Sequence, residues 1–197
     1  MAQNVKYVTA AKPKVAGAIS VAPLGTTLPT DAVADLDPAF KSLGYIGEDG
    51  LTNSNSPSIE TKKAWGGDTI LTSQSERPDT FTCSLVEALN VEVLKVIYGS
   101  DNVKESGGKI EVSATSTEPE PNVFVIDTIL SDNHLKRIVI PHGQVTEIGE
   151  LVYSDSDALA YEPTIQALPF NFDDGKLATH KEYIQKAADD LEDKVGD

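Results

Sequence analysis

Short segments in which apolar and polar residues alternate run along most of the chain. The clearest covers residues 80–87. There, Phe81, Cys83 and Leu85 alternate with Thr and Ser. A period of two is typical of a β-strand with one face on a core. Such segments, joined by short turns, predict a mainly β fold, either a two-sheet β-sandwich or a barrel.

The expected strands cover residues 15–22, 43–46, 69–74, 80–87, 110–115, 123–130, 135–141, 144–153 and 159–168. Residues 123–130 are apolar on both faces except for Asp127 and Thr128, which is typical of a central strand covered on both sides. The sequence Gly-Glu-Asp-Gly at 47–50 is a turn signal, so residues 43–61 are expected to form a hairpin.

Two segments have helical rather than strand periodicity. Leu89, Val93, Val96 and Ile97 recur at helical spacing before Gly99, which predicts one short helix with a glycine cap, flanking the sheets. The last stretch has Ile184, Ala188, Leu191 and Val195 at the same spacing, with acidic residues between them. An amphipathic terminal helix is therefore expected.

These patterns divide the chain into three parts. We expect an N-terminal arm at residues 1–14, a β-sandwich domain at 15–175 and an acidic helix or tail at 176–197. The domain includes a long loop, residues 23–42, that prolines and glycines interrupt repeatedly. Loops of this length are usually functional. This one is apolar enough to predict contacts between subunits or rings through Leu24, Leu28, Val33, Leu36 and Phe40.

Composition narrows the class of partner. The chain has 197 residues and 40% hydrophobic content, enough for one core. Its 16 basic and 31 acidic residues give a net charge of -15, which repels nucleic acid and anionic lipid. No apolar run is long enough for a membrane span and residues 1–15 lack the pattern of a signal peptide, so we expect a soluble protein made in the cytoplasm. Cys83 is the only cysteine, so no internal disulfide is possible.

The familiar catalytic signatures are absent, which predicts no enzyme activity and no cofactor or metal. Asp155 and Asp157 have the spacing that begins a calcium loop, but Ala160 and Gln166 occupy its glycine and bidentate-acid positions. A solvated turn is the better interpretation. The isolated histidines are interpreted as surface residues: His134, His142 and His180.

Three further groups admit two interpretations each. The carboxylate pairs Glu118 with Glu120 and Asp173 with Asp174 have the composition of an acid–base pair, but each lies in an expected turn, where both groups are solvated. Trp65 with Tyr45 and Tyr98 would suit a sugar-stacking platform. Aromatic residues beside a glycine corner more often cap the end of a sandwich core, and this is our expectation.

Residues 43–99 closely resemble the tail tube (major tail) proteins of long, non-contractile-tailed bacteriophages. The most specific pieces are residues 45–50 (YIGEDG), 63–68 (KAWGGD), 81–88 (FTCSLVEA) and 94–99 (LKVIYG). The resemblance implies a β-sandwich with a flanking helix, assembled into hexameric rings that stack into a hollow tube for the genome. It also implies a virion location, assembly in the host cytoplasm, and two partners, a tape-measure protein and a tail terminator.

The acidic charge acquires a role in such a tube, because duplex DNA slides past an acidic bore and sticks to a basic one. The acids expected to face the lumen are Glu76, Asp79 and Glu87. DNA passage would then be transient, without specific binding. The alternative function is a surface-binding β-sandwich module that recognises carbohydrate or mediates adhesion. A hydrolase with an unrecognised site is a weaker rival.

Overall fold

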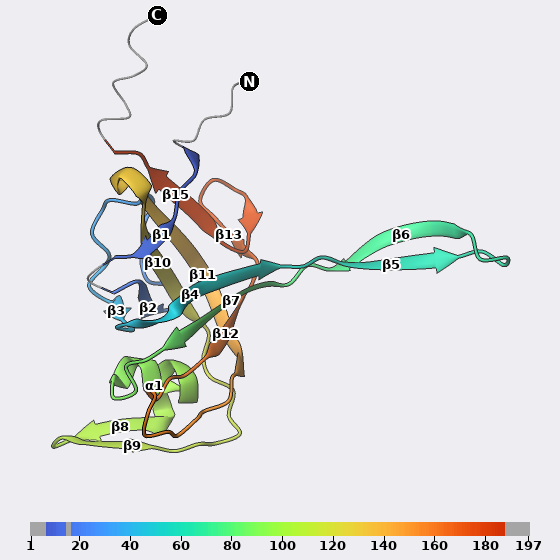
Figure 1. Cartoon of the computed structure of the whole chain (residues 1–197). Helices are drawn as coiled ribbons and strands as arrows, with labels where there is room; N and C mark the ends of the chain where they lie inside the picture. Colours follow the sequence, from blue (N-terminus) through green and yellow to red (C-terminus); the bar gives the residue numbers. More distant parts are fainter. Residues whose placement is uncertain (1–6, 15–16, 188–197) are drawn as a thin grey trace, which may run out of the picture.

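The centre of the fold is an antiparallel pair of long strands, β10 (Asn122–Leu130) and β11 (Leu135–Ile148). The computed structural model describes residues 7–14 and 17–187 (Figure 1). The other elements are β1 (Ala11–Pro13), β2 (Ile19–Pro23), β3 (Lys41–Ser42), β4 (Ile46–Asn55), β5 (Ser58–Lys63), β6 (Thr69–Glu76), β7 (Asp79–Leu85), α1 (Val91–Tyr98), η2 (Ser100–Asn102), β8 (Val103–Ser106), β9 (Lys109–Val112), η3 (Ser131–Asn133), β12 (Pro163–Ala167), β13 (Phe170–Asn171), β14 (Leu177–Ala178) and β15 (Lys181–Gln185).

Nine strands join in one antiparallel sheet. Its main path is β3-β2-β10-β11-β12-β7-β4. β1 and β2 lie end to end along the free edge of β10, while β15 and β12 lie end to end along the free edge of β11. The hairpins β5–β6 and β8–β9 and the short pair β13–β14 form separate two-stranded sheets.

The sheet folds over itself so that its two ends share one core. The inward residues of β7, Phe81, Cys83 and Leu85, belong to the same buried cluster as Ile19 of β2 and Phe124 of β10. The fold is mainly β, with 48% strand, and no sheet closes into a barrel. The sandwich prediction is therefore confirmed.

The bend in β11 has an identifiable cause. Asn122 and Phe124 of β10 pair with Gly143 and Ile140, so β11 carries an extra residue between these pairs, at Pro141 and His142. A bulge of this kind accommodates a proline, which has no N–H for the ladder. At Gly143, a Cβ would lie 2.6 Å from the Phe124 ring, so only glycine fits there. The two strands predicted at 135–141 and 144–153 are one strand ending at Ile148.

The predicted helix is confirmed as α1. Asn90 Oδ1 accepts a hydrogen bond from the Glu92 N–H at its start, and the Gly99 N–H donates to the Lys95 carbonyl at its end. Its inner face, which includes Val93 and Ile97, packs into the core. The central position predicted for residues 123–130 is confirmed too, since side chains on both faces of β10 are buried.

Two predictions from local pattern are wrong. Residues 47–50 form no turn: they lie within β4, where a register shift between Ile46 and Leu51 absorbs the glycines along β7. The helix predicted near the C-terminus is wrong for Lys181–Gln185, which is strand β15. Pairing with the open edge of β11 outweighs the helical spacing there. The remainder of that predicted helix, residues 188–197, lies outside the described residues.

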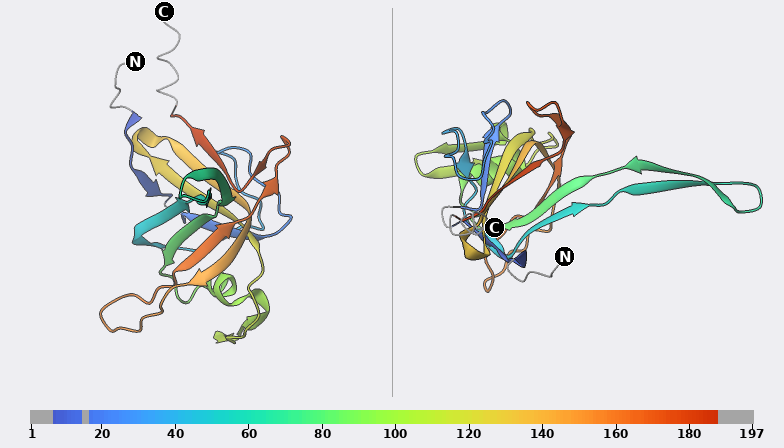
Figure 2. Two further views of the ribbon diagram at one scale, coloured as in Figure 1. Left: turned by 90° about the vertical axis from the view of Figure 1, so that its right-hand side faces the viewer. Right: turned by 90° about the horizontal axis from the view of Figure 1, so that it is seen from above.

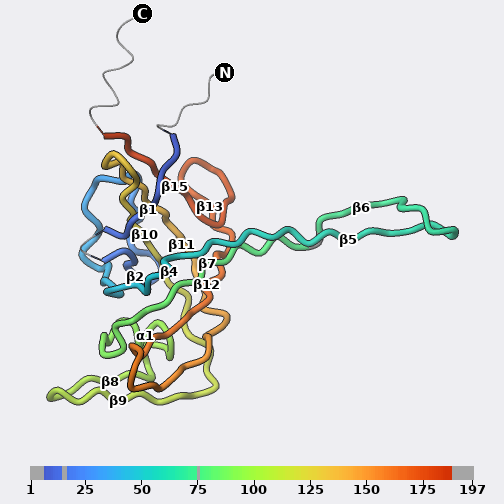
Figure 3. Tube along the Cα trace, viewed as in Figure 1, coloured from blue at the N-terminus to red at the C-terminus, as the bar shows by residue number. Residues whose placement is uncertain are grey.

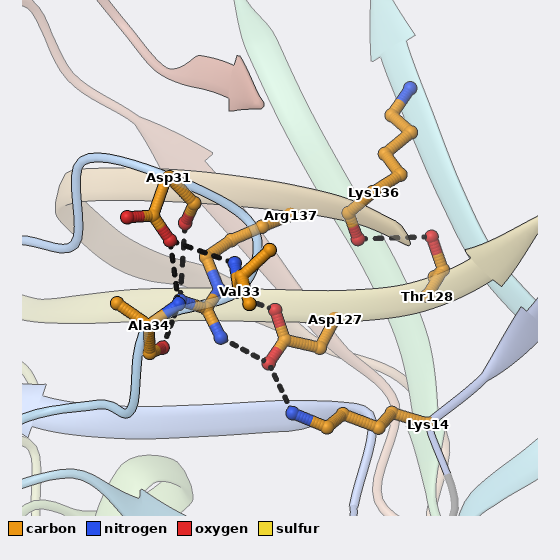
Figure 4. A network of polar contacts seen from close by, with 8 residues as sticks. All are labelled: Lys14, Asp31, Val33, Ala34, Asp127, Thr128, Lys136 and Arg137. Carbon is orange, nitrogen blue, oxygen red and sulfur yellow. Dashed lines mark hydrogen bonds and ion pairs between the residues drawn. The ribbon is translucent and has the colours of Figure 1, made fainter. Parts of the chain in front are cut away.

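A buried ion pair fixes the long loop to the sheet (Figure 4). Arg137 is 1% exposed, and its Nε and Nη2 donate to the two carboxylate oxygens of Asp127 at 2.6 and 2.9 Å. Its Nη1 donates to the backbone carbonyls of Asp31 and Ala34 at 3.1 and 2.8 Å. Lys14 Nζ lies 3.6 Å from the same Asp127 carboxylate. One guanidinium therefore joins β10, β11 and the loop.

The loop is also organised locally. The Asp31 carboxylate accepts hydrogen bonds from the N–H groups of Ala34 and Val33, which lower the pKa of Asp31 below its ordinary value. This turn presents the Asp31 and Ala34 carbonyls to Arg137, while Ala32 is buried.

Replacing Arg137 by Met should destabilise the subunit by roughly 3–5 kcal/mol, because the Asp127 charge stays buried without its partner. The loop also loses its anchor. Urea denaturation at neutral pH measures the change. Lys136→Met is the matched control: Lys136 is the neighbouring residue and pairs with Glu182 near the surface, where an ion pair contributes about 1 kcal/mol or less. Equal unfolding midpoints for the two variants would contradict the anchoring role.

Candidate assembly surfaces

The most prominent surface feature is a long two-stranded ribbon that projects from the body (Figures 1 and 3). It is the continuation of β4 and β7 as β5 and β6, and we refer to residues 56–78 as the arm. Figure 2 shows that the arm extends well beyond the sandwich. Among the arm side chains that the structure describes, none is buried.

The arm is exposed yet partly apolar. Ile59, Ile70 and Leu71 are each more than half exposed, and Trp65 at the tip has a relative exposure of 107%. The tip turns at Gly66 and Gly67, which have φ of 119° and 100°, values that favour glycine. An isolated two-stranded hairpin is at best marginally stable in water. The arm therefore has the properties of a surface that becomes covered by another protein.

This position of Trp65 overturns an expectation. We expected Trp65 to cap the core beside Tyr45 and Tyr98, whereas it lies in the turn that joins β5 to β6 at the arm tip and is fully exposed. Tyr98 instead packs edge-to-face on Tyr161 with ring centroids 6.0 Å apart. The three aromatic residues therefore form neither a core cap nor a sugar-stacking platform in the subunit.

The arm is held at its root by polar contacts. Arg77 Nε donates to Asn55 Oδ1 at 2.8 Å, and Asn53 Nδ2 donates to Asp79 Oδ1 at 2.9 Å. The second Asp79 oxygen accepts from the Thr179 hydroxyl at 2.5 Å and lies 2.7 Å from His180 Nδ1. Asp79 thus joins the arm root to the segment that precedes β15.

These contacts determine which of the three acids predicted to face the lumen have a carboxylate without a partner in the subunit. Asp79 is 1% exposed, so the expectation that it points outward is wrong for the subunit: its carboxylate lies inside and accepts hydrogen bonds from Asn53 and Thr179. Glu87 is half-buried and accepts from the Tyr45 N–H and Asn90 Nδ2. Glu76, at the arm root, is exposed. Of the three, Glu76 alone presents a carboxylate free of partners within the described residues.

The long loop contributes less free surface than its composition predicts. Leu28, Leu36 and Phe40 are half-buried in the subunit. Leu24 and Val33 are 46% and 59% exposed and remain available for contacts. The backbone carbonyls of Asp31 and Ala34 accept hydrogen bonds from Arg137, so this part of the loop belongs to the subunit's own fold.

The main sheet ends in two open edges. Its path terminates in β3, which has two residues, and in β4, which has ten. Most β4 side chains are exposed. An exposed edge strand of this length carries unpaired N–H and C=O groups that can pair with a strand of another chain.

The residues considered for chemistry do not assemble into a catalytic centre within the described part of the chain. No three His, Cys, Asp or Glu side chains there are grouped to hold a metal ion. Asp157 accepts hydrogen bonds from Ser154 and Ser156 in an exposed turn. Asp174 pairs with Lys181, and Glu120 accepts from Ser100. Burial raises the pKa of the Cys83 thiol to about 12, which leaves it unreactive.

The histidines differ in setting. His180 lies against Asp79 and packs edge-to-face on Phe81, with ring centroids 5.3 Å apart, so it is part of the structure rather than a free surface residue. His134 Nδ1 accepts a hydrogen bond from the Ala187 N–H.

Among the described residues, no helix has the length and apolar character required to cross a membrane.

A partly apolar arm that the described part of the subunit leaves exposed, an open sheet edge and a body stabilised by packing are the features of a structural β-sandwich protein that contacts other chains. The comparison with protein families makes the assignment specific. The family described as phage tail tube protein matches residues 1–188, and the chain belongs to this family. It is a structural protein of the bacteriophage tail, in a family that is not one of enzymes. No curated protein matches the chain.

The Asp79 cluster generates a pH-dependent prediction. Burial alone would raise the pKa of Asp79, but hydrogen bonds from Thr179, Asn53 and His180 outweigh it and hold the pKa below the ordinary value of 3.8. The folded state therefore favours the carboxylate. Its contribution is present above the unfolded pKa and is lost as the pH falls through the folded pKa.

Asp79→Asn should therefore lower the free energy of unfolding at pH 7 by roughly 1–3 kcal/mol. The difference from the parent protein should shrink as the pH falls below the unfolded pKa of 3.8. Urea denaturation at a series of pH values measures both effects. Asp155→Asn, in an exposed turn, serves as control and should leave stability unchanged. A difference for Asp79→Asn that grows on acidification would contradict the assigned direction.

Proposed function

We propose that copies of this chain form hexameric rings, and that the rings stack into the hollow tail tube through which the phage genome passes. The observation that carries the proposal is the arm, a ribbon whose exposed apolar side chains lie outside the core of its own subunit. The hexamer is the ring size that the resemblance of residues 43–99 implies. Family membership supports assembly into a multi-subunit tail.

The geometry supports two kinds of contact in such a tube. The open edge of β4 is suited to strand pairing with a neighbouring subunit of the same ring. A ring closes when each subunit contacts its two neighbours through two different faces. The arm extends beyond the body and is suited to reach a subunit in the adjacent ring. Leu24 and Val33, the exposed apolar residues of the long loop, supplement these contacts.

The proposed tube has further partners. A tape-measure protein in the bore and a terminator at the end belong to the function that the resemblance implies, as does assembly in the host cytoplasm. The net charge of -15 supports a bore past which DNA moves without specific binding. A carbohydrate-binding or adhesive module, the alternative, does not account for the arm, because the aromatic residues needed for stacking are not brought together.

Removal of the arm tests the proposal. We expect the purified full-length chain to form rings or tubes at high concentration in electron micrographs. A variant in which residues 59–75 are replaced by an Asn-Gly turn should form no tubes while keeping the melting temperature of the parent, because no described arm side chain is buried in the body. A parent protein that stays monomeric at every concentration, or arm-deleted protein that forms normal tubes, would contradict the proposal.

The charge of the bore is tested at Glu76. Glu76→Lys should leave tube formation intact but slow genome delivery, since a basic side chain in the lumen binds passing phosphates. Phage carrying the variant are compared with the parent for tail morphology and for the rate of DNA release. Glu118→Lys, in an exposed turn outside the arm, is the matched control. Equal release rates for all three would exclude Glu76 from the lumen.

A further inference from the structure

The arm tip differs in charge from the rest of the chain. Lys62 and Lys63 are the last two residues of β5, just before Trp65, and Asp68 is the acid that follows them, so the tip carries two positive charges and one negative charge. The chain as a whole has a net charge of -15. Neither lysine forms an ion pair within the described residues. The tip therefore presents an aromatic ring beside two uncompensated cations.

A surface of opposite character lies on the body, in the segment that we call the acidic loop, residues 149–162. It is closed at its base by a hydrogen bond from the Gly149 N–H to the Glu162 carbonyl. Its acids are Glu150, Asp155, Asp157 and Glu162, and the chain has no Lys or Arg between Arg137 and Lys176. All four side chains are exposed, and none of them forms an ion pair in the described part of the chain.

Beside the acidic loop is a mainly apolar hollow. It has a volume of about 540 Å³ and is lined by Leu159 of the acidic loop and by the segment before α1, which comprises Val86, Glu87, Ala88, Leu89 and Asn90. Leu89 is 84% exposed, although it is a large apolar side chain. On the loop itself, Val152 and Tyr153 are exposed as well. The hollow thus offers exposed apolar surface next to a loop that carries four acids.

The arm of one subunit does not meet this surface in the same subunit. The acidic loop lies beside α1 at the end of the body, and the arm projects away from the body in a different direction (Figures 1 and 2). Any contact between the two surfaces therefore joins different copies. Such a contact uses two different patches, so it leaves a free arm and a free hollow at the ends and permits continued growth.

Resting on the proposed function, we propose that the arm tip of one copy docks on the acidic loop of a second copy, with Trp65 in the hollow beside Leu89. Lys62 and Lys63 then face the carboxylates of the loop. The indole supplies the buried apolar area that typically dominates a protein interface, and the lysines select the neighbouring acidic loop. The groove beside Leu24 is a poorer receptor, because its lining residues Glu92 and Lys95 already pair with each other.

Charge exchange tests the pairing. Lys62→Glu/Lys63→Glu and Asp155→Lys/Asp157→Lys should each reduce the number of tubes in electron micrographs at least ~10-fold, because like charges then meet at the contact. The combination of all four substitutions should restore tubes. All of these side chains are exposed, so melting temperatures should stay at the parent value. If the parent forms tubes and either charge variant also does so at the parent level, or the combination fails to rescue, the docking site is wrong while the tube function stands.

Crosslinking provides a test that does not depend on charge. Ala64→Cys, beside Trp65, and Ala88→Cys, in the hollow, are introduced together, and assembled tubes are treated with a short bis-maleimide. We expect ladders of covalent oligomers, with monomer only in the two single variants and in the control pair Ala64→Cys/Ser113→Cys. Cys83 does not interfere, since it is buried. Monomer alone from tubes of the Ala64→Cys/Ala88→Cys variant overturns the proposal, and a parent that never forms tubes overturns the proposed function together with it.

Discussion

The ion pair between Arg137 and Asp127 is the interaction on which the arrangement of the body depends. A guanidinium that is 1% exposed is tolerated only when its donors are satisfied, and its partners come from two separate segments, β10 and the long loop. The carboxylate of Asp127 fixes β10 against β11, and the carbonyls of Asp31 and Ala34 fix the long loop across the outer face of the same strands. Residues 24–40 of the loop thus have a defined position without regular secondary structure.

Local sequence predicted those parts of the fold in which one periodicity dominates. The alternation around Phe81 and Leu85 identified β7, and the helical spacing up to Gly99 identified α1, because in both segments the apolar face of the element is the face that the core covers. Asp127, in an otherwise apolar run, and the Arg137 that pairs with it were the available signal for the ion pair. A charged side chain in a buried strand needs an oppositely charged partner, so each of these residues indicates the other.

The local sequence pattern does not show which strand a segment pairs with. Gly47 to Gly50 has turn composition, but β7 offers a ladder along which these residues continue as a bulged strand. Ile184 has helical neighbours in sequence, but the open edge of β11 takes the segment as β15. The arm is the extreme case: β5 and β6 pair only with each other, so their residues carry no pattern of burial from which a core-facing side can be read.

The contacts at the arm root have a consequence for the geometry of a polymer. Arg77 is hydrogen-bonded to Asn55, and Asp79 is hydrogen-bonded to Asn53, Thr179 and His180. These contacts set the direction in which the ribbon leaves the body, independently of any contact at its tip. The direction in which the arm leaves the body is therefore fixed at its root. If such arms join the layers of a stack, part of the rotation and rise from one layer to the next is determined inside each subunit, before any two subunits meet.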